Sequence, residues 1–169
     1  RLVLRLATHR LLLGDADLAY FREKKRWFEE RRQCGSILII PGTAFGDIAL
    51  VPAPFLKHPK GIRDITEWYI SGKARREYVW AVFEKQCEIA LLNLAKIHEA
   101  VGERVAAVFT TGTDFGTQCG PFISVAAYRD LYQPFHKEVN GWIHKNTTWK
   151  SFIHSCGSIY DFLPDFIDA

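Results

Sequence analysis

The sequence predicts an α/β fold built around a parallel sheet. Three short segments, ILII, VAAVFTT and TWKSFIHSCG, have the length and composition of strands. Longer segments with an apolar residue every three or four positions separate them, which is the spacing of amphipathic helices. Regular alternation of buried strands and long helices is typical of parallel sheets, and an open doubly wound sheet and a closed (β/α)8 barrel both fit it.

The first two predicted elements are a helix over residues 15–33 and a strand over residues 37–40. Asp15 and Asp17 are suited to capping the helix, whose aromatic residues follow helical spacing. The strand ILII is uniformly apolar and is followed by a Pro-Gly pair, so it is expected to be buried on both faces.

Residues 43–75 are expected to form an irregular, lid-like segment. They are too rich in proline for a central strand and too apolar for a linker. The aromatic residues of the segment are Phe45, Phe55, Trp68 and Tyr69. Two interpretations stay open, an apolar cover over the mouth of a barrel or an insertion packed against its side.

The next predicted elements are a helix over 76–101 and a strand over 105–111. The helix has one apolar face that includes Cys87, expected to fill the core, and Gly102 ends it. After the strand comes a glycine-rich loop, and Ser124 then caps a helix that Pro134 interrupts.

The last predicted elements are a strand over residues 148–157 and a helix over residues 158–169. Ser158 and Asp161 stand in the positions of a capping pair for this helix. Because Ala169 falls inside the helix and the chain contains no methionine, we expect a longer biological chain.

Composition excludes several classes of protein. The chain has 169 residues, 48% of them hydrophobic and 24% charged, which is the balance of a globular domain. The net charge of +3 is small and mixed in sign, which argues against nucleic-acid binding. No apolar run approaches the ~18 residues of a membrane span, and charges break the opening segment, so it is a poor signal peptide. The four widely separated cysteines favour free thiols and a cytoplasmic location.

Polar residues follow the second predicted strand in the loop TGTDFGTQCGP. The loop lacks the lysine of a phosphate-binding loop, and its DFG letters have no accompanying kinase motif. Asp114 and Gln118 remain as residues that could hydrogen-bond a substrate or help to hold a metal. The alternative is that Asp114 only accepts hydrogen bonds from turn amides.

His154 and Cys156 lie at the carboxyl end of the third predicted strand. Residues two apart in an extended segment project to the same side, so imidazole and thiol are expected to share one small space. Both are zinc ligands, and a catalytic zinc site typically uses three protein ligands. Taken alone the H-x-C motif is weak, because a buried cysteine beside a satisfied histidine is ordinary.

The segments TDFGTQCGPFISVAAYRDLYQPF and WKSFIHSCGSIYDFLPDFI resemble the uroporphyrinogen decarboxylase superfamily, and within it the cobalamin-dependent methyltransferase branch. The resemblance is clearest over residues 105–169. It implies a (β/α)8 barrel, of which residues 1–169 would form a single partial domain with about half of the barrel. It also implies zinc bound by His154 and Cys156, with a further cysteine expected beyond Ala169, and it places a functional acidic residue at Asp114. Cys119 is ranked below that further cysteine as a third ligand.

The function implied is methyl transfer between a small-molecule donor or thiol acceptor and a corrinoid supplied by a partner protein. Asp114 is expected to be catalytic and Gln118 to bind substrate. Two alternatives stay open: a decarboxylase-like lyase that needs no metal, and a non-catalytic barrel that binds a corrinoid protein. A homo-oligomer is also compatible with the sequence.

Overall fold

The computed structural model of the chain describes residues 12–30, 35–47, 57, 62 and 64–169. In chain order the elements are helix α2 (Asp15–Glu30), strand β1 (Ile37–Ile39), helices α3 (Ile65–Ala74) and α4 (Arg76–Val101), the 3-10 turn η1 (Gly102–Arg104), strand β2 (Ala107–Thr111), helices α5 (Val125–Leu131) and α6 (Gln133–Asn146), strand β3 (Lys150–Ile153), the 3-10 turn η2 (Tyr160–Phe162) and helix α7 (Leu163–Asp168).

The three strands form one parallel sheet in the order β1-β2-β3. The predicted α/β class with a parallel sheet is therefore confirmed. The sheet is open, with β1 and β3 at its edges, and no closed barrel is present in the described part of the chain. Parallel pairing places the carboxyl ends of all three strands along one edge of the sheet.

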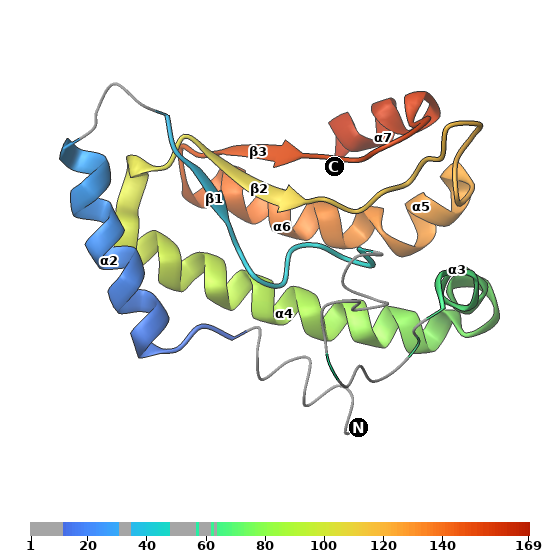
Figure 1. The fold of residues 1–169 in the computed structure, drawn as a ribbon, viewed down its shortest axis with the longest axis horizontal. Coiled ribbons are helices and arrows are strands. Elements are labelled where there is room, and N and C mark those ends of the chain that lie inside the picture. Colours follow the sequence, from blue (N-terminus) through green and yellow to red (C-terminus); the bar gives the residue numbers. More distant parts are fainter. Residues whose placement is uncertain (1–11, 31–34, 48–56, 58–61, 63) are drawn as a thin grey trace.

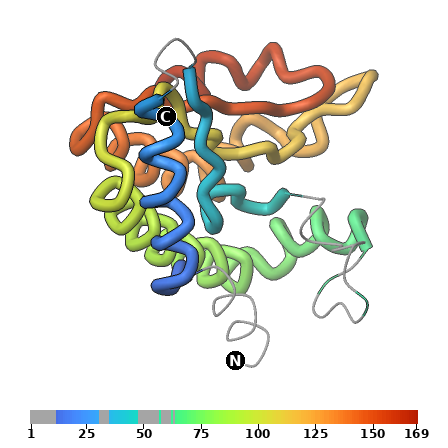
Figure 2. Tube along the Cα trace, turned by 60° about the vertical axis from the view of Figure 1, so that its left-hand side comes forward, coloured from blue at the N-terminus to red at the C-terminus, as the bar shows by residue number. Residues whose placement is uncertain are grey.

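Helices cover one face of the sheet. α4 and α6 run along this face and contact each other, and α2 packs beside α4 (Figures 1 and 2). The core lies between the helices and the covered face, where Val108 is fully buried and Leu38 is 8% exposed. A cluster of aromatic rings, with Phe45, Phe83 and Phe115 at most 1% exposed, extends this core toward α5.

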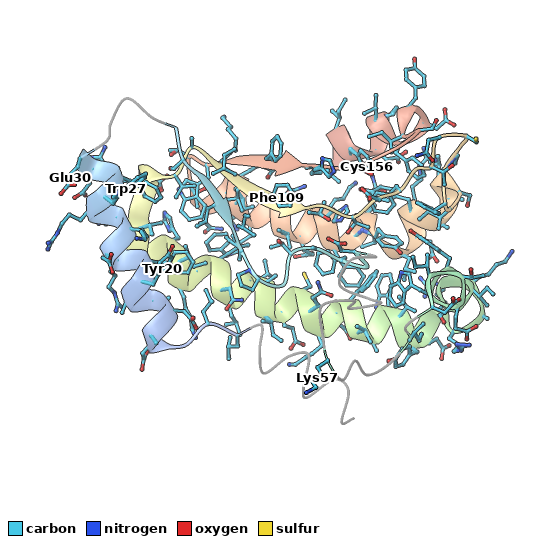
Figure 3. All side chains as sticks on the ribbon, in the orientation of Figure 1. Tyr20, Trp27, Glu30, Lys57, Phe109 and Cys156 are labelled. Atoms are coloured by element: carbon cyan, nitrogen blue, oxygen red, sulfur yellow. The ribbon has the colours of Figure 1, made fainter. Side chains whose placement is uncertain are left out.

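The opposite face of the sheet is largely open. Ile37 is 60% exposed, Ile39 is 71% exposed and Phe152 on β3 is 45% exposed. Phe109, labelled in Figure 3, packs against Phe152 on this face with ring centroids 5.7 Å apart. The prediction that β1 is buried on both faces is therefore wrong, because helices flank only one face here.

Several predicted helix boundaries agree with the structure. Asp17 accepts a hydrogen bond from the Gly14 amide at the start of α2, and Ser124 accepts one from Ala127 at the start of α5. Gly102 ends α4 at a φ of 62°, and Pro134 lies in the first turn of α6. Cys87 is buried in the core, as predicted.

Two predicted stretches differ from the structure. Part of the segment expected to be irregular is helix α3, because Asp64 caps it by accepting from the Glu67 amide. The last helix begins at Leu163 and not at Ser158, whose amide instead donates to the Thr117 carbonyl. Ser158 and Asp161 therefore do not form the predicted capping pair.

The predicted lid-like segment contributes to the core where it is described. Phe45 is fully buried among aromatic rings, and Trp68 is 6% exposed. Both interpretations of the segment stay predictions, because a cover and a packed insertion would each bury these aromatic rings. Phe55 lies outside the described residues.

Among the described helices, none is both long enough and apolar enough to cross a membrane.

Candidate metal centre

The candidate site is formed by two segments at the carboxyl edge of the sheet. The first is the loop 112–121 after β2, which carries Asp114, and the second is the segment 154–157 after β3. Figure 3 shows Cys156 just beyond the end of β3, on the side of α7. Parallel strands with adjacent carboxyl ends bring these two segments together.

Hydrogen bonds join the two segments at successive residues. The Cys156 amide donates to Asp114 Oδ1 at 2.7 Å, and the Phe115 amide donates to Ser155 Oγ at 2.9 Å. Two residues beyond Cys156, the Ser158 amide donates to the Thr117 carbonyl at 2.7 Å. Asp114 is therefore held in place by the same segment that carries the imidazole and the thiol.

Two glycines allow this close contact between the loops. A Cβ added to Gly116 would lie 2.5 Å from the Ser158 amide nitrogen, and one added to Gly157 would lie 2.2 Å from the Gly116 carbonyl carbon. Gly157 also has a φ of 82°, a conformation that other residues rarely adopt. Both positions therefore require glycine.

The side chains of His154, Cys156 and Asp114 form one group. His154 Nε2 lies 3.2 Å from Cys156 Sγ and 3.9 Å from Asp114 Oδ1. One ligand atom from each of the three residues lies within 4.8 Å of the others. The side chains of His154 and Cys156 meet as the sequence predicted, although they lie just after β3 and not within it.

The carboxylate of Asp114 raises the pKa of the Cys156 thiol. The thiol donates a hydrogen bond to Asp114, and the negative charge opposes its ionisation. Without a cation, the thiol is therefore held in its protonated form at neutral pH. A divalent cation bound between the three groups would reverse this effect, because its charge stabilises the thiolate.

The donor set and its spacing fit zinc. Zinc accepts imidazole nitrogen, thiolate sulfur and carboxylate oxygen at about 2.0 to 2.3 Å, so ligand atoms around a tetrahedral ion lie about 3.3 to 3.8 Å apart. The separations of 3.2 and 3.9 Å from His154 Nε2 are close to this range. The His154 side chain is 52% exposed and the Asp114 side chain 27% exposed, which leaves the group open to a fourth ligand.

The other predicted site residues lie apart from this group. Gln118 is exposed on the turn that Thr117 and Gly120 close, and no hydrogen bond joins it to the three ligand candidates. Its predicted role in substrate binding stays a prediction. Cys119 is exposed on the same turn and does not belong to the group. Cys34 lies outside the described residues.

Three residues at this edge were not singled out from the sequence. Ser155 fixes the loop through the Phe115 amide, and the Tyr69 hydroxyl donates to the Asp114 carbonyl at 3.3 Å. Asp47 follows β1. The pKa of Tyr69 is raised to about 12, first by burial, then by the charge of Asp114 and then by the charge of Asp47. Asp47 could have been predicted, because it follows a strand just as Asp114 does. Tyr69 could not, because its contact depends on the position of α3.

Comparison with protein-family models, with curated proteins and with solved structures finds no match for this chain. The resemblance to the uroporphyrinogen decarboxylase superfamily thus stays a prediction that rests on the motifs of residues 105–169.

Proposed function

We propose that the protein is a zinc-dependent methyltransferase that moves a methyl group between a small molecule and a corrinoid carried by a partner protein. The observation that carries the proposal is the meeting of His154, Cys156 and Asp114 at the carboxyl edge of a parallel sheet. In parallel α/β folds this edge is where active sites are found.

His154 Nε2, Cys156 Sγ and a carboxylate oxygen of Asp114 would hold the zinc. Bound zinc supplies a Lewis acid, which stabilises a substrate thiolate or polarises the atom that bears the methyl group. This set assigns Asp114 to the metal, where the sequence predicted a catalytic residue and a further cysteine as the third ligand. If Asp114 is a ligand, Asp114→Asn should remove the metal. If Asp114 is a catalytic residue, the variant should keep the metal and lose only the activity.

The chain's own residues orient the ligands. Ser155 Oγ accepts from the Phe115 amide, and the Asp114 carboxylate accepts from the Cys156 amide, so these bonds hold the two loops together. The same carboxylate also interacts with the Cys156 thiol. Such outer hydrogen bonds typically contribute tenfold to hundredfold to metal affinity. The corrinoid belongs to the partner protein, and its binding surface on this chain is not assigned.

We also propose that the three strands are part of a (β/α)8 barrel. Support comes from their parallel order, from the helices on one face and from the apolar side chains Ile37, Ile39 and Phe152 on the other. In such a barrel the helix-free face lines the interior, which is filled with packed apolar side chains.

Zinc content is the direct test. The protein is purified without chelator and its zinc is measured by elemental analysis, with the expectation of about one equivalent. His154→Ala and Cys156→Ala are each expected to lose the metal, because two ligands hold zinc far less tightly than three. Cys119→Ala is the matched control, since it removes an exposed thiol on the neighbouring loop and should leave the zinc content unchanged.

Methyl transfer is measured next, with a methylated corrinoid and a panel of thiols. Zinc in the wild type without any methyl transfer would support the non-catalytic alternative. Porphyrinogen decarboxylation that persists in chelator would support the lyase. Unchanged zinc content in both the His154 and the Cys156 variants would refute the metal site.

A further inference from the structure

A cleft lies between α3 and the start of α5, beside the loop that carries Asp114. Two adjoining hollows of about 570 and 420 Å³ form it and share Tyr69, Lys73 and Phe122 in their walls. The smaller hollow is within the size range of ligand pockets, about 300 to 1,000 Å³. Neither hollow contains a residue of the candidate metal group.

The larger hollow of the cleft is mostly apolar, and the smaller hollow combines apolar with polar side chains. The rings of Tyr69 and Phe122 are stacked, with centroids 4.9 Å apart and planes 8° from parallel. Trp68, Leu131 and Tyr132 line the smaller hollow, and each of them is buried. Broad aromatic surfaces of this kind bind flat apolar molecules, because burial of both surfaces releases water.

The cleft carries one unbalanced positive charge. Arg76 is paired with Asp130 at the rim, with 2.5 Å between Nε and Oδ2. Lys73 lines both hollows and makes no ion pair with a described residue. Glu67 pairs with Arg75 and Asp130 pairs with Arg76. Because neither acid pairs with Lys73, the Lys73 ammonium is available to an anion from solution.

We propose that this cleft binds a small aromatic carboxylate, whose ring packs along Tyr69 and Phe122 and whose carboxylate pairs with Lys73. The inference concerns binding and stands whether or not the neighbouring site transfers methyl groups. Tyr69 joins the two sites, since its ring lines the cleft and its hydroxyl donates to the Asp114 carbonyl.

The experiment is calorimetric titration of the full chain with 2-naphthoate, compared with the uncharged 2-naphthamide. We expect saturable binding of naphthoate with a Kd below about 1 mM, and binding of the amide that is about fivefold weaker or more, because it cannot pair with Lys73. Lys73→Ala should weaken naphthoate binding by about the same factor, Phe122→Ala should weaken it further, and Lys73→Arg should restore most of it.

Two controls separate this cleft from other surfaces. Lys145→Ala removes an exposed lysine on α6, and Ile39→Ser reduces the apolar surface of the open sheet face; both should bind naphthoate as the wild type does. Circular dichroism confirms that each variant is folded. Absence of saturable binding, equal binding of acid and amide, or equal binding by wild type and Lys73→Ala would overturn the proposal. Weakened binding in Ile39→Ser would assign the ligand to the sheet face instead.

Discussion

The two ends of the sheet each hold a carboxylate beside a histidine, and the two clusters differ in what else surrounds the carboxylate. At the amino end, Glu103 lies with His98 and Thr148. At the carboxyl end, Asp114 lies with His154 and Cys156. Both clusters join the segment around β2 to the segment around β3.

The Glu103 carboxylate is saturated by fixed donors. It accepts from the Thr148 amide at 2.8 Å, from Thr148 Oγ1 at 2.5 Å and from His98 Nε2 at 2.7 Å. These bonds, led by that of the Thr148 hydroxyl, lower the pKa of Glu103 to about 2. Because both carboxylate oxygens are occupied, this cluster is suited to holding the segments together.

The Asp114 carboxylate has fewer fixed donors than the Glu103 carboxylate. It accepts from the Cys156 amide at 2.7 Å and raises the pKa of the Cys156 thiol, and imidazole nitrogen, sulfur and carboxylate oxygen converge within 4.8 Å. Similar residue types thus hold two segments together at the Glu103 cluster and form a candidate ligand set at the Asp114 cluster. Four predictions test this distinction, beginning with the largest expected effect.

Gly157→Ala should destabilise the protein far more than Gly102→Ala. Both glycines have positive φ, but a Cβ at 157 would meet backbone at 2.2 Å, whereas one at 102 would meet nothing within 4 Å. We expect a loss of about 3 kcal/mol or more for Gly157→Ala and about 1 to 2 kcal/mol for Gly102→Ala, measured by urea unfolding. Equal losses of stability would mean that the two ends of the sheet tolerate an added methyl group equally well, which would contradict this prediction.

Asp114→Asn should weaken zinc binding by about a hundredfold or more, while Glu103→Gln should leave it unchanged. The amide oxygen of asparagine is an uncharged and poorer zinc ligand than a carboxylate. Competition with a chelating dye measures both affinities. If Asp114→Asn binds zinc like the wild type but transfers no methyl group, Asp114 is a catalytic residue and not a ligand.

Glu103→Gln should lower the free energy of unfolding by about 1 kcal/mol at pH 7, because the three hydrogen bonds to the carboxylate lose their charge assistance. The pKa of Glu103 is lower in the folded chain than in the unfolded chain, so the stabilisation is present above about pH 4.5 and is lost as the pH falls toward 2. The difference between wild type and variant should shrink over this range. Glu88→Gln, in an exposed pair with Lys85, is the control and should change stability by less than about 0.5 kcal/mol.

Asp114→Asn should make Cys156 react several times faster with iodoacetamide in zinc-free protein at pH 8. Removing the carboxylate lowers the thiol pKa, which increases the fraction of thiolate. Mass spectrometry of peptides measures the rate, with Cys119 as the exposed internal reference. An unchanged rate at Cys156 would show that the carboxylate does not govern this thiol.

Local signals in the sequence predicted much of the fold. Helices α2, α4 and α5 begin or end at capping residues, and these boundaries could be read from Asp17, Gly102 and Ser124. The open face of β1 could not be predicted, because an apolar strand looks the same whether one or both faces are covered. The start of α7 was misplaced because the Ser158 amide bonds to a loop 41 positions earlier in the chain.

Part of the candidate site could also be predicted. The convergence of His154 and Cys156 follows from their two-residue spacing, which is a local property. The distance of Asp114 from them follows from the register of β2 and β3 and from the glycine contact, neither of which the sequence displays. Tyr69 depends on the packing of α3 and shows no local signal at all.

The contact between Gly116 and Gly157 has an evolutionary consequence. Each glycine occupies the volume that a methyl group on the other would need, so a substitution at one position cannot be rescued by a change at its counterpart. In homologues that keep these two loops in register, both glycines should persist together or disappear together with the cysteine and histidine beside them.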